Sequence, residues 1–382
     1  MNSVREGVYE RLVAHIQNGT TDQADSALNV PITNFTSAEH LDKELAVFRS
    51  QPLVVAMASE VPEPGSFVTR DILGAPLLIV RQKGGSVAVY RNMCRHRGGK
   101  VELEEKGRKP FFVCSYHGWS YDGDGALRGV PFEEHLGGVD RGCNSLLRIH
   151  SEERHGMIWA DFSAQPGRSV ADYLGPADDK LAAYAVDKTT VYMEQKIEAA
   201  INWKLVIDGA IDVLHPQFLH PKGVGKLIET NASLWEDFGR HGRSWSAYKK
   251  LSDKVRAGTH TPEDGRYCSG NFVVFPNVCM IPTPTHYEFW NVWPDITDPG
   301  KCLVHIRFLI DPKLLDEKRA GQIEKSWAIL QQAATEEDFP MEETIQANAT
   351  SHPVGSFLYG RSEAPCQHLH RQMARAMAEL AA

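Results

Sequence analysis

Two short pairs of cysteine and histidine lie close together in the chain. Cys94 and His96 form the first pair, and Cys114 and His117 form the second, with residues 97–113 between the pairs. Thiolate sulfur and imidazole nitrogen both bind transition metals, so the two pairs offer two sulfur and two nitrogen ligands. A tetrahedral zinc ion would accept this set, and a zinc site is the simplest interpretation.

The residues beside both pairs favour an iron–sulfur cluster over zinc. Arg-Gly-Gly follows His96, and Gly-Trp-Ser follows His117. Glycines next to the ligands let two backbone loops close over a bulky cluster and direct amides toward its sulfides. The framed pattern, C-x-H-R-G-G with C-x-x-H-G-W-S-Y, resembles a Rieske [2Fe–2S] site, in which two cysteines hold one iron and two histidines the other. The resemblance implies an electron-carrying cluster held by Cys94, His96, Cys114 and His117.

A second group of acids and histidines lies further along the chain. Asp208, Asp212 and His215 are spaced by four and three residues, so they would share one stripe of a helix. His220 comes five residues after His215 and could not share its face of a regular helix. Each histidine precedes a proline, which biases the backbone of that histidine away from the α region. We therefore expect the helix to kink or end near His215, so that both imidazoles turn toward one point and suit iron(II).

These residues follow one another in an order that resembles a known family. Asn-Trp-Lys occupies positions 202–204, and the acids and histidines follow as D-x-x-H-x-x-x-x-H, C-terminal to the cluster pattern. This order resembles that of the large (alpha) subunits of Rieske non-haem iron oxygenases, from about residue 35 through the C-terminal helix. The resemblance implies that His215, His220 and one carboxylate hold a mononuclear iron, which binds O2 and oxidises an organic substrate.

The carboxylate ligand must come from another part of the chain. The resemblance indicates Asp338, which follows a long helical stretch (314–335) where family members supply this ligand. Glu337 is adjacent and Glu342 lies one helical turn further on, so the sequence leaves both as alternatives. Acidic runs are also often only solvated surface.

The resemblance implies a different role for Asp212. In the family, the acid three residues before the first iron histidine hydrogen-bonds that histidine and a cluster histidine of a neighbouring subunit in a ring of three. By this match, Asp212 would join His117 of one copy to His215 of the next. Such a carboxylate would fix the imidazole tautomers and give electrons a short path, which is the catalytic role we expect for it. An ordinary helix acid is the alternative.

Composition indicates an ordinary globular protein. The 382 residues are 42% hydrophobic and 24% charged, which is enough for two domains. We expect a cytoplasmic protein without a membrane span, because no signal-peptide core and no run of 18 apolar residues is present. The seven cysteines lack disulfide-like spacing, which fits reduced thiols. A net charge of −8 argues against a nucleic-acid partner.

Electrons should reach this chain from another protein. No dinucleotide-binding motif is visible in the sequence, so we expect a ferredoxin or a flavin reductase as the donor. Basic residues gather beside the first cysteine pair and would steer an acidic donor protein, although a solvated turn is the alternative. These residues are Arg95, Arg97, Lys100, Lys106, Arg108 and Lys109. By resemblance we expect a homotrimer, with an added small beta subunit as an open alternative.

The sequence predicts an α+β fold with three parts. Residues 1–47 should form helices that pack on the catalytic domain, residues 48–165 an all-β Rieske domain, and residues 166–382 the catalytic domain. A hairpin signal at 77–90 leads into Cys94, and a Gly/Pro stretch at 165–168 is the expected boundary.

The resemblance implies that the catalytic domain is helix-grip-like, with an antiparallel sheet around a long helix. Its expected strands are 189–200, 271–280, 286–293 and 303–310. The segment 222–260 lacks regular patterning, so we expect a lid over the substrate entrance or a disordered loop.

The expected reaction is hydroxylation of an aromatic or other cyclic apolar substrate. Ring dihydroxylation is favoured because it is the commoner outcome in the family. A monooxygenase or oxidative N- or O-demethylase is the alternative, because one fold supports all these outcomes. A quaternary amine would need an aromatic cage, for which four tryptophans are available: Trp235, Trp245, Trp290 and Trp293. A Rieske electron carrier is the non-enzymatic alternative, but a carrier has no use for a second set of metal ligands.

Overall fold

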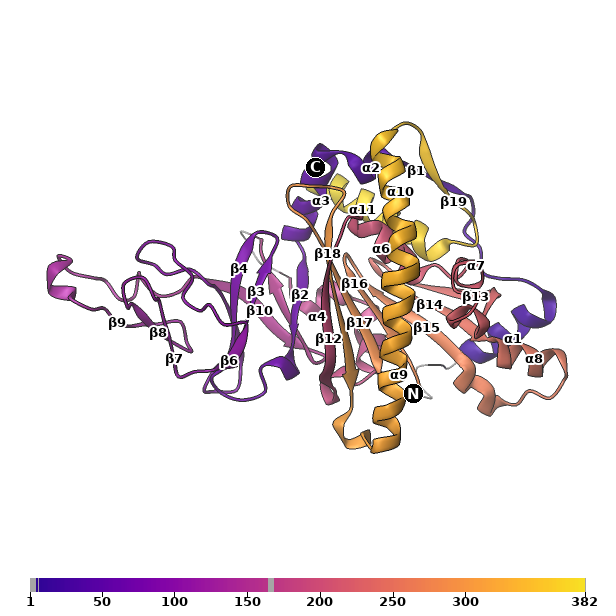
Figure 1. Ribbon diagram of the computed structural model, residues 1–382, viewed down its shortest axis with the longest axis horizontal. Coiled ribbons are helices and arrows are strands. Elements are labelled where there is room, and N and C mark those ends of the chain that lie inside the picture. The colour runs from indigo at the N-terminus through magenta and orange to yellow at the C-terminus, as the bar shows by residue number, and fades with distance from the viewer. Residues whose placement is uncertain (1–4, 6, 164–167, 382) are drawn as a thin grey trace. The chain divides into compact units, whose positions relative to one another are not determined.

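The computed structural model describes residues 5, 7–163 and 168–381, and these form two compact units (Figure 1). One unit comprises Arg49–Tyr173 with Ala185–Val191 and contains the cysteine pairs; we call it the cysteine unit. The other comprises Met1–Phe48, Leu174–Tyr184 and Tyr192–Ala382; we call it the histidine unit. The boundary expected at 165–168 lies largely outside the described residues. The mixture of helices and antiparallel sheets confirms the predicted α+β class.

The cysteine unit contains two antiparallel sheets. The larger sheet has the order β2-β11-β10-β5-β4-β3-β6, and the smaller has the order β7-β8-β9. The strands of the larger sheet are β2 (Pro52–Met57), β3 (Ser66–Ile72), β4 (Ala75–Arg81), β5 (Val87–Arg91), β6 (Lys106–Arg108), β10 (Arg148–Arg154) and β11 (Met157–Asp161). Those of the smaller sheet are β7 (Phe111–Val113), β8 (Ser120–Asp122) and β9 (Leu127–Gly129).

Two hairpins position the cysteine pairs in this unit. Strands β4 and β5 pair from Leu77↔Arg91 to Arg81↔Val87, as the sequence predicted, and β5 leads into Cys94. Strands β7 and β8 pair on either side of the second ligand pair, which occupies their turn. Strand β4 is an inner strand of its sheet, between β3 and β5, and most of its apolar run is buried.

The histidine unit is built on a seven-stranded antiparallel sheet of order β12-β18-β17-β16-β15-β14-β13. Its strands are β12 (Thr190–Ala199), β13 (Ile228–Phe238), β14 (His241–Tyr248), β15 (Cys268–Val274), β16 (Val278–Pro282), β17 (Tyr287–Pro294) and β18 (Cys302–Ile310). One row of side chains crosses four strands on a single face: Val273, Cys279, Trp290 and Ile306.

Helices cover this same face of the sheet. Side chains two residues along a strand share a face, so Asn271 and Phe308 belong with the row above. Asn271 Nδ2 donates to the carbonyl of Ala210 (2.7 Å), in α6 (Trp203–Ile211). The ring of Phe308 packs edge-on against Trp327 (4.8 Å), in α9 (Glu317–Gln331). We call it the helix-bearing face.

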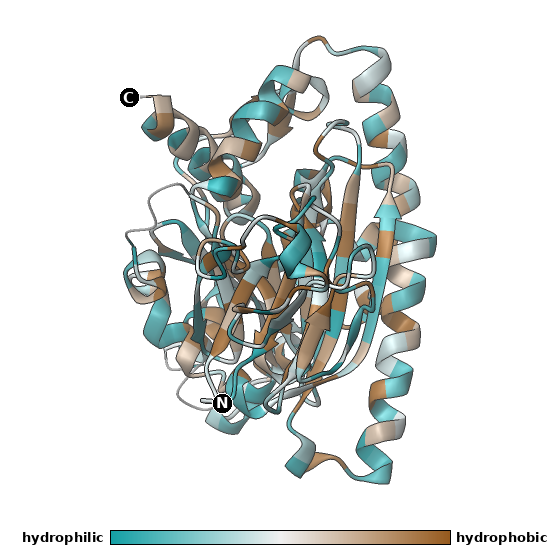
Figure 2. Ribbon diagram, turned by 90° about the vertical axis from the view of Figure 1, so that its left-hand side faces the viewer, coloured by the Kyte–Doolittle hydropathy of each residue, from teal (hydrophilic) through white to brown (hydrophobic). Residues whose placement is uncertain are grey.

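Helix α9 continues through a π-helical segment, Gln332–Asp338, into α10 (Phe339–Ser351). Together they form the long column that crosses the sheet in Figure 1. Hydrophilic and hydrophobic residues alternate along it (Figure 2), as expected of helices with one buried and one exposed side. None of the described helices is long and apolar enough to span a bilayer.

Two segments that lie far apart in the sequence pair in the histidine unit. Strand β1 (Leu28–Pro31) pairs with β19 (Ser356–Tyr359), so the N-terminal and C-terminal segments form one small sheet. The helices of these segments are α1 (Val8–Asn18), α2 (Thr33–Thr36), α3 (Ala38–Arg49) and α11 (Ala364–Ala381). Helix α3 begins directly after Ser37, whose Oγ accepts the amide of His40 (3.3 Å) at the start of the helix.

The expectation of an irregular segment at 222–260 was wrong. Strands β13 and β14 form a hairpin there, and α8 (Lys249–Arg256) follows it. Charged residues within the hairpin are paired, since Glu236 accepts both from Arg243 Nε (2.7 Å) and from Trp245 Nε1 (2.6 Å). Position 242 in β14 requires glycine, because a Cβ there would lie 2.1 Å from the ring of Trp235.

Candidate metal centres

The first cysteine pair lies in a tight loop closed by two backbone hydrogen bonds. The amide of Gly98 donates to the carbonyl of Cys94 (2.9 Å), and the amide of Cys94 donates to the carbonyl of Gly99 (2.7 Å). His96 is therefore held within a single turn of chain that begins at Cys94.

The second loop repeats this arrangement. The amide of Gly118 donates to the carbonyl of Cys114 (2.9 Å), and the amide of Cys114 donates to the carbonyl of Trp119 (2.9 Å). Gly98 and Gly118 occupy equivalent positions with φ of 79° and 73°, a left-handed conformation that favours glycine. The two loops are thus equivalent in backbone geometry, and each presents one thiol and one imidazole.

The four side chains fit a bound metal cluster. Cys94 and Cys114 are 3% and 2% exposed, and a Cβ on Gly99 would lie 3.6 Å from Cys114 Sγ, so the two loops approach each other closely. The rings of His96 and His117 are 4.4 Å apart. Nδ1 of His96 is buried without a hydrogen-bond partner among the described residues, as expected of a ligand nitrogen. Desolvation and the nearby His117 lower the pKa of His96, which favours the neutral imidazole that binds metals.

Aromatic residues support this centre. The ring of His96 stacks on Trp119, with centroids 5.0 Å apart and planes 7° apart. The hydroxyl of Tyr121 lies 3.4 Å from Cys94 Sγ and accepts the amide of Arg95 (3.0 Å). Burial raises the pKa of Tyr121, so its hydroxyl keeps a proton that it can donate to a thiolate. The sequence contained Tyr121 within the W-S-Y pattern but did not indicate this contact.

The second centre begins where α6 ends. Asp212, the residue after the helix, is extended (φ −69°, ψ 132°), and α7 (Pro216–Leu219) follows as a separate short helix. The expectation that His215 would leave the α region was wrong, because the chain turns at Asp212 and His215 then starts α7 with φ −65° and ψ −31°. His220 does leave the α region, with φ −111° and ψ 46°.

Three of the expected metal ligands converge in space. Nε2 of His220 lies 2.9 Å from Asp338 Oδ1, and Nε2 of His215 lies 3.6 Å from the same oxygen. One ligand atom from each of the three residues falls within 4.8 Å of the others. Two imidazoles and one carboxylate form the donor set of a non-haem iron(II) site, which leaves coordination positions open for other ligands.

Each histidine is held from behind by a carboxylate. Asp212 Oδ2 lies 3.1 Å from Nδ1 of His215, and Glu337 hydrogen-bonds Nδ1 of His220. Because Nδ1 of each ring is occupied in this way, Nε2 of each ring is left as the metal-binding nitrogen. Burial opposes the ionisation of Asp212, but hydrogen bonds from His215 and the Leu214 amide outweigh it and keep its pKa below the usual range.

Glu337 is a residue whose role the sequence did not reveal. It was considered only as an alternative to Asp338, yet in the structure the two neighbours contact opposite nitrogens of His220. They close the π-helical segment, whose wider turn is a common feature of functional sites. In the sequence, only the position of Glu337 next to Asp338 could have indicated this role.

The second alternative ligand, Glu342, is buried away from the histidines. Its Oε1 lies against α6, where a Cβ on Gly209 would come within 2.2 Å of it. It is 8% exposed, and its Oε2 has no hydrogen-bond partner among the described residues. Burial, followed by the charges of Asp338 and Asp208, raises the pKa of Glu342 well above its usual range.

A raised pKa makes the contribution of Glu342 to stability depend on pH. The fold favours the protonated acid, so this contribution is complete below the usual pKa of 4.5 and is lost as the pH rises through the raised value. We expect Glu342→Gln to remove this dependence. Thermal unfolding of both proteins from about pH 5 to about pH 8 should show an advantage of the variant that grows with pH. Parallel curves would contradict the raised pKa.

The four tryptophans do not gather into one cage. Trp290 lies on the helix-bearing face, whereas Trp293, an odd number of residues away, points to the opposite face. The ring of Trp245 is covered by the guanidinium of Arg243 at 4.7 Å. Trp235 packs against a histidine of α11. Of the four, Trp290 has a buried Nε1 without a hydrogen-bond partner among the described residues.

Comparison with known families assigns both units. Residues 184–379 match the family described as ring hydroxylating alpha subunit (catalytic domain), and residues 51–140 match the Rieske [2Fe-2S] domain. The two matches cover the second and first candidate centres, respectively.

Individual relatives include both monooxygenases and dioxygenases. The glycine betaine monooxygenase oxygenase subunit of Chromohalobacter salexigens is 32% identical over 209 residues, which are 54% of this chain and 46% of the relative. The biphenyl 2,3-dioxygenase subunit alpha of Rhodococcus jostii is 32% identical over 270 residues, 68% of this chain and 55% of the relative. The chain thus spans about half the length of the curated relatives it matches.

Solved structures share the fold. A quaternary ammonium Rieske monooxygenase in complex with L-carnitine superposes with a TM-score of 0.77 at 20% identity, over 92% of this chain and 96% of that one. Naphthalene 1,2-dioxygenase from Rhodococcus sp. bound to indole gives 0.74 at 20% identity, over 98% and 99%.

Proposed function

Because the chain belongs to the ring-hydroxylating alpha-subunit family of Rieske oxygenases, we propose that it is the terminal oxygenase component of an electron-transfer system. Enzymes of this family are oxidoreductases that incorporate O2, and its two domains use a Rieske [2Fe–2S] cluster and a mononuclear iron. The convergence of His215, His220 and Asp338 is the observation that carries the proposal. An electron carrier would have no use for this second ligand set.

The substrate that we propose is a quaternary amine, which is monooxygenated at a carbon next to nitrogen. Three relatives are glycine betaine monooxygenase oxygenase subunits, and a quaternary ammonium monooxygenase shares the fold. These similarities, and not a tryptophan cage, favour the alternative from the sequence over ring dihydroxylation. The naphthalene and biphenyl dioxygenases among the relatives keep dihydroxylation of an aromatic ring as the second candidate.

The reaction consumes one O2, two electrons and two protons for each carbon hydroxylated, and it releases one water. If the carbon is an N-methyl group, the hydroxylated product loses formaldehyde and leaves the demethylated amine. When bound, the mononuclear iron supplies O2 activation and the cluster supplies stored electrons.

The protein side chains hold these groups in place. Asp212 and Glu337 fix the tautomers and orientations of His215 and His220, and Asp338 supplies the negative ligand. We further propose that Asp212 also accepts a hydrogen bond from His117 of a neighbouring copy in a trimer. Electrons would then pass from one protomer's cluster to the next protomer's iron.

The electron donor that we propose is a ferredoxin or a flavin reductase, but the basic surface beside the cluster loops is narrower than the sequence suggested. Lys100 pairs with Asp71 at 2.9 Å, and Lys109 pairs with Glu102 at 2.9 Å. Arg97 is exposed and forms no ion pair with any described residue. We therefore assign the steering of an acidic donor mainly to Arg97, through its effect on encounter rate.

Product analysis tests the substrate class. The purified protein with a surrogate donor system would receive betaines, carnitine-like amines, naphthalene and biphenyl under 18O2. Formaldehyde or aldehyde release with a dealkylated amine, in proportion to O2 consumed, would support the proposal. A diol that carries two 18O atoms would instead establish the dioxygenase. Absence of turnover by a fully iron-loaded protein would reject both substrate classes, with Asp338→Ala as the inactive control.

A further inference from the structure

Helix α6 carries three charged residues along one stripe. Lys204, Asp208 and Asp212 follow one another at intervals of four residues, with Asp212 just beyond the helix. Asp212 holds His215, so the position of the end of α6 affects the iron centre directly. This end of the helix is held by contacts from another part of the chain.

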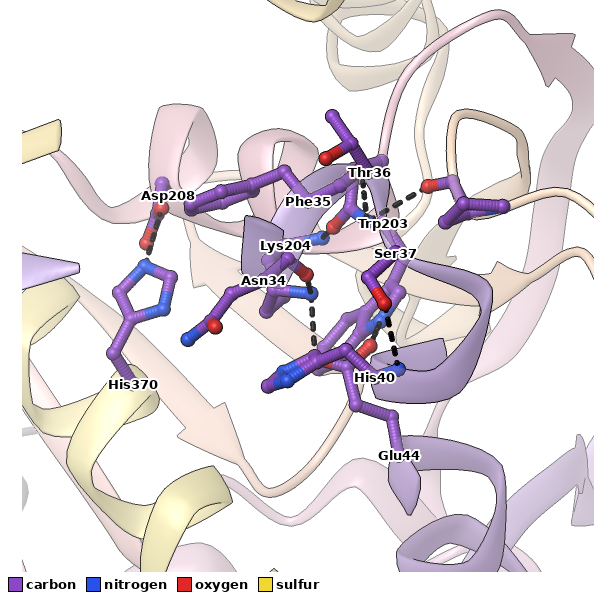
Figure 3. A network of polar contacts seen from close by, with 12 residues as sticks. Asn34, Phe35, Thr36, Ser37, His40, Glu44, Trp203, Lys204, Asp208 and His370 are labelled. Atoms are coloured by element: carbon purple, nitrogen blue, oxygen red, sulfur yellow. Dashed lines mark hydrogen bonds and ion pairs between the residues drawn. The ribbon is translucent and has the colours of Figure 1, made fainter. Parts of the chain in front are cut away.

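The C-terminal segment of the chain holds it through Asp208. The hydroxyl of Tyr359, in β19, donates to Asp208 Oδ2 (2.6 Å), and Nε2 of His370, in α11, lies 2.9 Å from the same oxygen. Figure 3 shows the contact between Asp208 and His370 as a dashed line. The three residues are 8%, 7% and 7% exposed, so water does not compete strongly for these bonds.

Asp208 depends on these two donors. Its second oxygen, Oδ1, is buried without a hydrogen-bond partner among the described residues. Burial and the adjacent Asp208 raise the pKa of Tyr359, which therefore stays protonated as a donor. Loss of either donor would leave a buried carboxylate poorly compensated, and such a group shifts position or draws in water.

Movement of Asp208 would be transmitted to Asp212. The amide of Asp212 donates to the carbonyl of Asp208 (2.8 Å) in the last hydrogen bond of α6, and Cys366 Sγ lies 3.8 Å from that carbonyl. Asp212 in turn accepts the amides of Leu214 (2.8 Å) and His215 (3.2 Å) and contacts Nδ1 of His215 (3.1 Å). A continuous set of hydrogen bonds thus links the C-terminal segment to an iron-site imidazole.

We propose that Tyr359 and His370 are positioning residues for the mononuclear iron site, acting through Asp208 and Asp212. This inference rests on the metal site of the proposed function. By this inference, the C-terminal segment contributes to metal affinity although none of its residues is a metal ligand. Removal of an outer hydrogen-bond partner of a metal-site histidine typically weakens metal binding by about 10–100-fold.

The test compares iron(II) affinity in matched variants that keep the cluster. Tyr359→Phe and His370→Phe each remove one donor to Asp208, whereas His370→Gln keeps an N–H of similar reach. Tyr287→Phe is the control, because the half-buried Tyr287 also donates its hydroxyl at 2.7 Å, but to the carbonyl of Tyr184. Each protein would be depleted of its mononuclear iron and titrated with iron(II) against a chromophoric chelator, and its thermal midpoint would be recorded.

Because Tyr359 and His370 act through Asp208 and Asp212, we expect Tyr359→Phe and His370→Phe to weaken iron(II) binding by up to about 10-fold, the lower end of the range for a direct partner. His370→Gln should recover part of the affinity, and Tyr287→Phe should leave it unchanged. Equal affinities in all variants, with similar small losses of thermal stability, would overturn the inference and reduce the contacts to packing. If the unmodified chain itself fails to bind one iron beyond the cluster, the proposed function fails instead.

Discussion

Replacing Asp338 with alanine is expected to remove the mononuclear iron and leave the cluster intact, so iron content falls from about three to about two atoms per chain. The reason is that Asp338 Oδ1 is the shared partner of both imidazoles, at 2.9 Å from His220 and 3.6 Å from His215. Without its carboxylate, two neutral imidazoles remain, a set too weak to retain iron(II). Iron analysis with the visible spectrum of the cluster measures both centres, and oxygenase turnover should fall to background.

Neighbouring acids provide graded controls for this experiment. Glu337→Gln keeps the ligands but weakens the support of His220, so we expect a loss of about 10–100-fold in iron affinity or activity. Glu336 is exposed beside it, and Glu336→Ala should behave like the unmodified protein. Full iron content in Asp338→Ala would show that another carboxylate is the ligand, and Glu337→Ala would then be the variant that loses it.

Replacing Lys204 with methionine should destabilise the histidine unit by about 3–5 kcal/mol. Lys204 and Glu44 are each about 1% exposed, and their charged atoms lie 2.6 Å apart. Figure 3 shows the surrounding network, in which Lys204 Nζ also donates to the Asn34 carbonyl (3.0 Å) and Trp203 Nε1 donates to Glu44 (2.8 Å). Without Lys204, the Glu44 carboxylate remains buried opposite an apolar side chain, which is the costly outcome.

The double variant distinguishes this mechanism from simple loss of packing. Lys204→Met combined with Glu44→Leu removes both charges, so we expect it to recover most of the stability lost in the single variant. Lys43→Met is the control. Lys43 pairs with Glu39 on the surface of α3, the helix that contains Glu44, and such an exposed pair contributes less than about 1 kcal/mol. Thermal midpoints should fall by about 10 °C for Lys204→Met and hardly change for Lys43→Met. A double variant as unstable as the single one would contradict the prediction.

The Lys204–Glu44 pair also explains what the Asn-Trp-Lys sequence does. Trp203 and Lys204 bind Glu44 of α3, and Asn202 caps α6 while its side-chain amide donates to the Phe35 carbonyl (3.3 Å). The motif thus anchors the N-terminal segment to the start of the helix whose far end supports His215. The sequence showed these residues as a family signature, and their contacts required the folded chain.

The sequence by itself determined the features that depend on local spacing. The two cysteine–histidine pairs lie within tight loops of a few residues, so their spacing and glycines predict loop shape and donor set together. The β4–β5 hairpin and the helix after Ser37 follow from equally local signals. For the same reason, the α+β class and the family were evident before the fold was known.

Tertiary structure alone decided which distant residues meet. Glu337 supports His220, and His370 holds Asp208, across separations in the chain that no helical or strand period relates. The segment 222–260, expected as a lid or a disordered loop for lack of regular patterning, instead forms a hairpin in which Arg243 pairs with Glu236. The physical reason is that the energy of a buried polar group depends on its partner. Local sequence records the group, but only the packed chain supplies the partner.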